Sequence, residues 1–294
     1  MTEHWLHTII PTSIPTSTLA RADELVRKTA FLAGLVAPET AACLSEHLKI
    51  TNAHYSSVID GRPTEPEVLN RAFILEHHQS AFGDIPELRR RIVAVLCQHF
   101  QILYRPTHRD GIRAFARALT FEHFALLGLQ PHLWSLSRGL NRRLDEYQSG
   151  TAVDESIGKD GFEGGQKRIG GGQLAFIDFM LDVCLEEVDY VTAALNRREL
   201  RESVSRAYKK NPLLKESGIR PETMPALLAL LIQGALPRSE FTTFIGLQSE
   251  AASDQLSKLI SIGIVVSPPS NLQRLEVGLT AWFAQDLLPD FHLA

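Results

Sequence analysis

The chain has 294 residues, 44% of them hydrophobic, so it can bury a large core in one or two domains. Its net charge of −4 gives no general attraction to nucleic acid or to an anionic membrane, so such binding would need a local basic patch. The three cysteines, Cys43, Cys97 and Cys184, have no paired spacing, and no apolar run reaches membrane-spanning length. We therefore expect reduced core thiols, a cytoplasmic location and no membrane association.

The first third of the chain predicts a series of helices after an irregular lead-in at residues 1–18. Apolar residues recur at helical spacing, and prolines and glycines mark the boundaries. The first helix ends at Ala37-Pro38, the second ends at Gly61, the third begins near Pro66 and the fourth near Pro86.

The stretch from Arg105 to Arg117 has the form of an anion-binding loop. Polar residues up to Gly111 lead into apolar residues at helical spacing from Ile112 to Leu119, which predicts a loop followed by a helix N-terminus. Free backbone N–H groups and the positive end of the helix dipole favour an anion at such a point. The sequence therefore predicts a place for a phosphate, and the side chains decide whether its chemistry is complete.

The middle of the chain predicts a charged surface helix from Arg138 to Tyr147. Seven glycines between Gly158 and Gly172 then predict a loop. This loop matches no nucleotide-binding spacing and follows no predicted strand, so a flexible connector is favoured over a phosphate cradle. An apolar stripe from Leu174 to Leu195 predicts a core helix.

The last part of the chain predicts a linker at 211–223 and a small domain at 224–294. Helices are expected at 227–232, 239–244 and 249–262, followed by a hairpin of 264–266 with 272–277. Three helices followed by a hairpin form a winged helix-turn-helix. From Pro225 to Ala294 this module has three basic and six acidic residues, so it should bind DNA poorly by itself.

Several segments, in this order, resemble Fic-domain proteins of the subgroup with a C-terminal winged helix. The family's inhibitory helix has Ser or Thr, three residues, Glu, then Gly or Asn; here the pattern falls as Ser56, Asp60 and Gly61, with Asp in place of Glu. Segments 133–140 and 176–188 are similar to the helices after the Fic motif, and 236–263 resembles the winged helix. The resemblance implies a mainly α fold, with a Fic-like helical bundle at 19–210 and a winged helix-turn-helix domain at 224–294.

The family's active loop reads His-x-Phe-x-Asp/Glu-Gly-Asn-Gly-Arg-x-x-Arg, and the resemblance implies transfer of AMP from ATP to a protein hydroxyl. Aligned on Asp110-Gly111, the chain keeps the acid that would bind Mg²⁺ as Asp110, the next residue as Gly111 and the last Arg as Arg117. The other motif positions differ. Proline replaces the general-base His at Pro106, Ile112 replaces the Asn, Arg113 replaces the second Gly, and Ala114 replaces the first phosphate-binding Arg.

Each of these differences removes a physical function. Pro106 has no titratable group, and a general base is typically worth about 10²–10⁴-fold in rate. Ala114 cannot clamp a phosphate through two hydrogen bonds. Arg113 places a side chain where a ligand needs close backbone approach, and a left-handed conformation there would be strained. Asp60 and Arg117 are still expected to pair, as a structural contact.

We therefore expect a degenerate, non-catalytic Fic-like pseudoenzyme that acts as a regulatory or protein-interaction module. No catalytic residue and no cofactor are expected, and the partner would be another protein or a second copy; a DNA-associated regulator is one form, disfavoured by the acidic module. The alternative is an active Fic-type nucleotidyltransferase that binds ATP and Mg²⁺ and uses His108, or another base outside the motif, as its general base.

Two further groups of residues are given ordinary structural interpretations. The 11 histidines, including His77, His78 and His99, lack metal-binding spacing and are expected to be scattered in the core or on the surface. The basic runs Arg89–Arg91 and Arg138–Arg143 are interpreted as solvated helix faces, with binding of a polyanion as the alternative.

Overall fold

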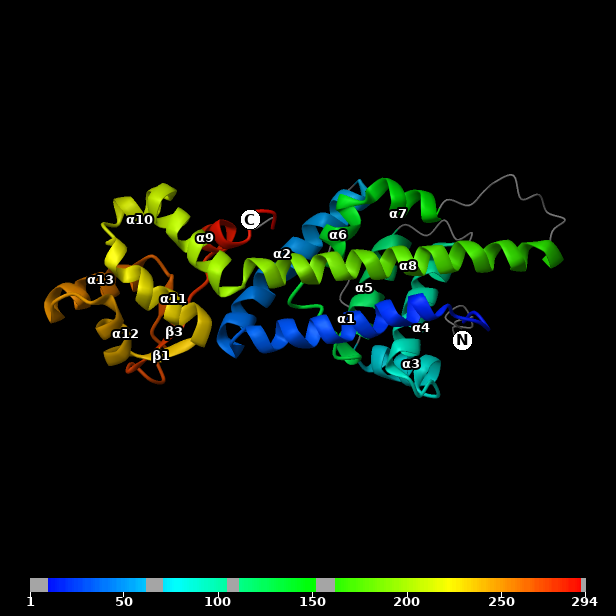
Figure 1. Ribbon diagram of the computed structural model, residues 1–294, viewed down its shortest axis with the longest axis horizontal. Helices are drawn as coiled ribbons and strands as arrows, with labels where there is room; N and C mark the ends of the chain where they lie inside the picture. The colour runs from blue at the N-terminus through cyan, green and yellow to red at the C-terminus, as the bar shows by residue number, and fades with distance from the viewer. Residues whose placement is uncertain (1–9, 62–70, 105–110, 152–161, 292–294) are drawn as a thin grey trace. The chain divides into compact units, whose positions relative to one another are not determined.

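A computed structural model of the chain describes residues 10–61, 71–104, 111–151 and 162–291. Most of these residues are helical (Figure 1), so the prediction of a mainly α fold is confirmed. Contacts divide the chain into two compact units, one within residues 1–30 and 52–188 and the other within 31–51 and 189–294. This division differs from the predicted domains, because residues 31–51 and 189–223 pack with the C-terminal part of the chain.

The first unit is built from consecutive helices. Prolines and glycines mark two of the expected boundaries: Pro38 begins the second helix, and Gly61, with φ of 67°, follows its end. Three of the helices, the first, the second and the last, continue into the second unit. Their bounds are α1 Thr16–Leu35, α2 Pro38–Asp60, α3 Arg71–Phe82, α4 Leu88–Leu103, α5 Ile112–Leu126, α6 Leu136–Arg142, α7 Leu144–Thr151 and α8 Phe162–Ala194.

Helix α4 lies at the centre of the first unit. It packs against α5, which also contacts α3, and an apolar cluster from these three helices contains Ile74, Ile102 and Leu119. Every residue from Ile92 to Phe100 is buried, although an amphipathic surface helix would bury only one face. The polar side chains within that range must therefore find hydrogen-bond partners inside the protein.

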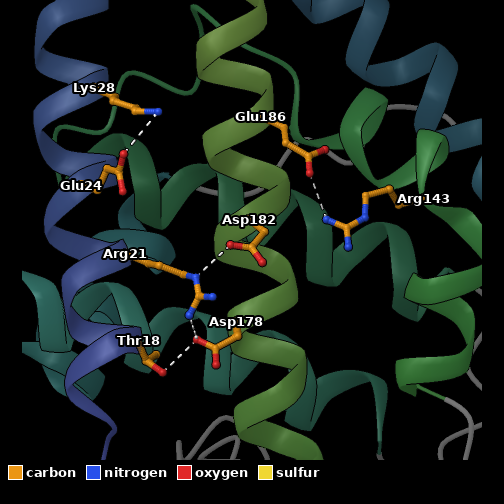
Figure 2. Close-up of polar contacts among 8 residues, drawn as sticks. All are labelled: Thr18, Arg21, Glu24, Lys28, Arg143, Asp178, Asp182 and Glu186. Carbon is orange, nitrogen blue, oxygen red and sulfur yellow. Dashed lines mark hydrogen bonds and ion pairs between the residues drawn. The ribbon is translucent and has the colours of Figure 1, made fainter.

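Helices α1 and α8 lie side by side and are joined by polar contacts (Figure 2). The Thr18 hydroxyl donates to Asp178 Oδ1 at 2.8 Å, and Arg21 contacts the carboxylates of Asp178 at 3.3 Å and Asp182 at 3.0 Å. These side chains keep a third or more of their surface exposed, apart from the buried Thr18. Exposed ion pairs of this kind contribute roughly 0–1 kcal/mol each.

Two predictions for the first unit are wrong. The glycine-rich segment is helical from Phe162 onwards, while Gly158 to residue 161 lie outside the described residues. Extending an existing helix costs far less than nucleating one, so the stable core part of α8 can carry residues of poor helix propensity. The expected surface helix from Arg138 to Tyr147 is two helices, α6 and α7, and both of those end residues are buried because they face polar partners in the core.

The second unit combines short helices with a small sheet. Helix α9 packs against α11 and α14, and α12 packs against α11 and α13. The sheet is antiparallel with strand order β1-β3-β2, and its register pairs Leu236 with Leu275 and Val265 with Val277. The element bounds are α9 Arg197–Lys210, α10 Pro212–Glu216, the 3₁₀ helix η2 Pro221–Thr223, α11 Met224–Gln233, β1 Ala235–Pro237, α12 Arg238–Ile245, α13 Ser249–Ser261, β2 Val265–Val266, β3 Arg274–Val277 and α14 Ala281–Leu287.

The expected helices and hairpin of this unit are confirmed, with two differences. Strand β1 was not expected, because three residues that end in Pro237 are too few to show the alternation of a strand. The expected linker at 211–223 contains α10 and η2, since Asn211 caps α10 through its side chain and Pro212 begins that helix.

Candidate functional site

The stretch that was predicted to hold the site, from Arg105 to Arg117, includes the N-terminus of α5. Residues 105–110, which include Pro106, His108 and Asp110, lie outside the described residues. Gly111 has φ of 87°, a left-handed conformation that a side chain would strain, and α5 starts at the next residue. Arg113 is exposed within the regular helix, so the strain expected at this position is not present. The left-handed conformation occurs at Gly111 and not at Arg113.

Arg117, one turn further along α5, points into the protein and is held by α2. Its Nη2 atom lies 2.8 Å from Asp60 Oδ2 and 2.8 Å from Ser56 Oγ, and it also donates to the Ser56 carbonyl at 3.1 Å. The Arg117 and Asp60 side chains are only 3% and 7% exposed. The predicted pair is therefore confirmed, and three of the expected residues, Ser56, Asp60 and Arg117, are brought together.

A chain of neutral hydrogen bonds lies beside the Arg117 guanidinium. Thr120 Oγ1 donates to the Ala116 carbonyl, so it accepts from His99 Nδ1 at 2.7 Å. His99 Nε2 is then unprotonated and accepts from the Tyr147 hydroxyl at 3.0 Å. Three helices, α4, α5 and α7, contribute to this chain. It gives both ring nitrogens of His99, a buried residue of α4, a hydrogen-bond partner.

Burial keeps both aromatic groups of this chain uncharged. The pKa of His99 is lowered to about 3, first by burial and then by the charge of Arg117. Burial raises the pKa of Tyr147, which Arg117 only partly offsets. Both ring nitrogens of His99 are used inside this chain of hydrogen bonds, and its lowered pKa disfavours protonation at neutral pH, so we interpret His99 as a structural group.

A second polar cluster, which the sequence prediction missed, joins α3 to α4 and α5. His77 Nδ1 lies 3.3 Å from His123 Nε2, and His78 Nδ1 lies 3.0 Å from His123 Nδ1. Gln98 Nε2 lies 3.1 Å from His77 Nε2. One proton arrangement satisfies all three contacts: Gln98 donates to His77, His77 donates to His123, and His123 donates to His78.

These three histidines were expected to be scattered, but they are in contact. Because His123 uses a different ring nitrogen toward each neighbour, the three lone pairs do not meet at a common point. Over the part of the chain that the structure describes, no group of three or more His, Cys, Asp or Glu side chains could hold a metal ion. Burial, with smaller contributions from His77 and His78, lowers the pKa of His123 to about 3. The cluster is a neutral hydrogen-bonded chain.

A third buried contact joins α6 to α8. Arg138 Nε donates to Glu187 Oε2 at 2.9 Å, and the two side chains are 1% and 0% exposed. Gly139 allows this approach, because a Cβ there would lie 2.7 Å from both Glu187 Cγ and Val183 Cγ1. Burial raises the pKa of Glu187, and the charges of Arg138 and Arg142 lower it. The effect of burial is larger, so the pKa is raised to about 7.

Most of the remaining basic residues of the two runs are paired with acids, whereas Arg91 donates to the backbone carbonyls of Ile85 and Gly83. Arg89 contacts Glu87 at 2.8 Å and Asp23 at 3.3 Å, and Arg143 contacts Glu146 at 2.6 Å. These contacts favour the interpretation as ordinary helix faces over binding of a polyanion. For Arg138 the prediction of a solvated position is wrong, because Glu187 holds it in the core.

Comparisons with known protein families and with curated proteins found no match to this sequence. The Fic resemblance therefore stays a prediction from the motif segments. The cysteines are unpaired as expected: Cys97 and Cys184 are buried and Cys43 is half-buried. In the described ranges, no helix combines the length and the hydrophobicity needed to cross a bilayer.

Proposed function

We propose that this chain is a degenerate Fic-like protein that acts as a non-catalytic regulatory or protein-interaction module. The observation that carries the proposal is the state of Arg117, which in the Fic alignment is the only retained phosphate-binding arginine. Its guanidinium is buried and already donates to Ser56 and Asp60. A phosphate could bind to its Nη2 group only after that contact is broken.

The energetic cost of freeing Arg117 supports this proposal. Removing one partner from a buried ion pair costs about 3–5 kcal/mol, because the other charge stays buried without compensation. Such a cost would weaken nucleotide binding by roughly 10²–10³-fold or more. In the Fic alignment the general base and the first phosphate-binding Arg are also missing, so three separate functions would have to be restored for catalysis.

The second unit supports a protein partner better than a DNA partner. We interpret its order of elements, α11-β1-α12-α13-β2-β3, as a winged helix-turn-helix, in which the third helix would read the major groove. The exposed residues of α13 are serines and acids, Glu250 and Asp254 among them. Its one lysine, Lys258, forms an ion pair with Asp254 at 2.8 Å. Phosphate binding needs free cations, so a second copy or another protein is the proposed partner.

Calorimetric titration with ATP and Mg²⁺ tests the proposal. We expect no binding at millimolar ATP by the natural protein, and none by Asp60→Ala, in which Arg117 is released. Asp23→Ala, which removes a surface acid, is the matched control. ATP binding that appears only in Asp60→Ala would mean that the α2 contact inhibits a competent site, which contradicts the non-catalytic proposal.

The alternative, an active nucleotidyltransferase with His108 as its base and Mg²⁺ on Asp110, has its own signature in the same experiment. The natural protein would bind ATP, and Asp110→Ala would abolish the binding. Transfer of labelled AMP to protein in a cell extract, lost in His108→Ala, would then establish that activity.

A further inference from the structure

The second unit contains an apolar cavity of about 140 Å³. Its walls come from the end of α1, from α2, α9 and α11, and from residues around α14, and all of them belong to this one unit. Most of the lining side chains are aliphatic, including the buried Leu44, Leu200, Leu231 and Leu287. A leucine-lined cavity of about 150 Å³ holds a molecule the size of benzene, so this cavity has room for roughly six carbon atoms.

The cavity has one polar end. Two of its lining residues, Gly34 and Arg197, are exposed, which places its mouth beside them. Arg197 is the single charged residue of the lining, and its guanidinium has no hydrogen-bond or ion-pair partner among the residues that the structure describes. The next residue, Arg198, differs in both respects, since it lies outside the lining and contacts Glu202 at 3.2 Å.

The other polar groups of the lining are already satisfied. The Thr40 hydroxyl donates to the Leu231 carbonyl at 2.9 Å, so its proton needs no acceptor from a ligand. Arg197 is the first residue of α9, a helix of 14 residues, and the positive end of that helix adds to its charge. An apolar interior with a cation at its mouth is complementary to a molecule with an aliphatic tail and an anionic head.

We propose that this cavity binds an aliphatic carboxylate with a tail of about six carbons, its carboxylate at Arg197. This ligand site goes beyond the function proposed above and does not depend on the nucleotide chemistry of the first unit. Leu231 and Ile232 of the lining belong to α11, which leads directly into β1 and α12. A bound tail therefore stabilises the packing of α11, the helix that precedes the first strand of the small sheet.

Chain length provides the first test. Calorimetric titration of the full chain with butanoate, hexanoate, octanoate and dodecanoate should show about fourfold tighter binding for each added methylene until the cavity is full, near six to eight carbons, with no gain beyond. Affinity that does not depend on length, or an absence of binding by every acid at millimolar concentration, would overturn the proposal.

The charged head provides the second test. Hexan-1-ol, the neutral match of hexanoate, should bind about tenfold more weakly, because it cannot pair with the guanidinium. Arg197→Gln should remove this difference and leave the alcohol's affinity unchanged, whereas Arg198→Gln should change neither. Equal affinity of acid and alcohol in the natural protein would mean an apolar cavity without carboxylate recognition.

A cavity-filling variant locates the binding. Val36 is a half-buried lining residue, so Val36→Phe can fill part of the space with little effect on the deeper core. We expect this variant to lose at least tenfold in affinity for both hexanoate and hexan-1-ol, with an unchanged far-ultraviolet circular dichroism spectrum. Unchanged affinity in Val36→Phe would place the binding elsewhere and contradict the assignment.

Discussion

The two units of this protein bury different kinds of side chain. In the described residues, the buried charged groups and imidazoles, Arg117, Arg138, Glu187, His77, His99 and His123, all belong to the first unit. The buried polar side chains of the second unit are uncharged, and its cavity is lined mainly by leucines. The first unit therefore depends on pairing and protonation, while the second depends on apolar packing, and each should respond to a different perturbation.

The largest effect is expected from breaking the Arg138–Glu187 pair. Arg138→Met should lower the free energy of unfolding by about 3–5 kcal/mol, because Glu187 is left buried with only the more distant Arg142 guanidinium, at 3.6 Å, beside it. Arg138→Met with Glu187→Leu should recover most of that loss, since the contact becomes apolar. Urea denaturation measures both. As a control, Arg143→Met removes two partly exposed ion pairs, with Glu146 and Glu186, and should cost less than about 1 kcal/mol for each pair. A similar loss for Arg138→Met and Arg143→Met would contradict the distinction between buried and surface pairs.

A smaller effect is expected from acid. The pKa of His123 is lowered to about 3 in the folded chain, against an ordinary value of 6.5. Below about pH 6.5 the unfolded chain binds a proton that the folded chain excludes. The free energy of unfolding therefore decreases as the pH is lowered, by about 2 kcal/mol from this group at pH 5. His99, with the same lowered pKa, should act in the same direction.

Glu187 acts with the opposite sign. Its pKa is raised from 4.5 to about 7, so its contribution to stability is present below about pH 4.5 and is lost as the pH rises through 7. Comparing each variant with the natural protein separates the groups: His123→Gln should reduce the loss of stability between pH 7 and pH 5. An unchanged pH dependence in His123→Gln would contradict the claim that His123 is uncharged in the folded protein.

The smallest effect is expected between α1 and α8. Arg21→Ala removes both ion pairs that join α1 to α8 in Figure 2, yet it should change the unfolding free energy by less than about 1 kcal/mol, because these side chains are partly exposed. Salt should weaken the contribution further. A loss above about 2 kcal/mol in thermal or chemical denaturation would show that surface charges, too, hold the first unit together.

Much of the fold was predictable because its boundaries are local. Pro38 and Gly61 delimit α2 through backbone effects that need no tertiary partner, and the hairpin of β2 and β3 follows from short-range alternation. Local reasoning failed where the outcome depends on the rest of the chain. The glycine-rich start of α8 and the three-residue strand β1 have weak preferences of their own.

The candidate site divides in the same way. The Asp60–Arg117 pair was predictable because the resemblance placed both residues in known positions. The contacts of His77 with His123 and of Arg138 with Glu187 were not, because each joins residues more than 40 positions apart. The only sign of a buried charge in the nearby sequence is an arginine or glutamate within an apolar stripe. Glu187, between Cys184 and Val191 on the predicted core helix, was the one available signal.

A double-mutant cycle on Asp60 and Arg117 tests most directly whether α2 holds the Arg117 side chain. The unfolding free energies of the natural protein, Asp60→Ala, Arg117→Ala and the double variant give the coupling between the two side chains. We predict a loss of about 3–5 kcal/mol for Arg117→Ala and a coupling of about 2–3 kcal/mol. An unchanged melting temperature for Arg117→Ala, or a coupling below about 0.5 kcal/mol, would mean that Arg117 is free to bind another group and would contradict this account.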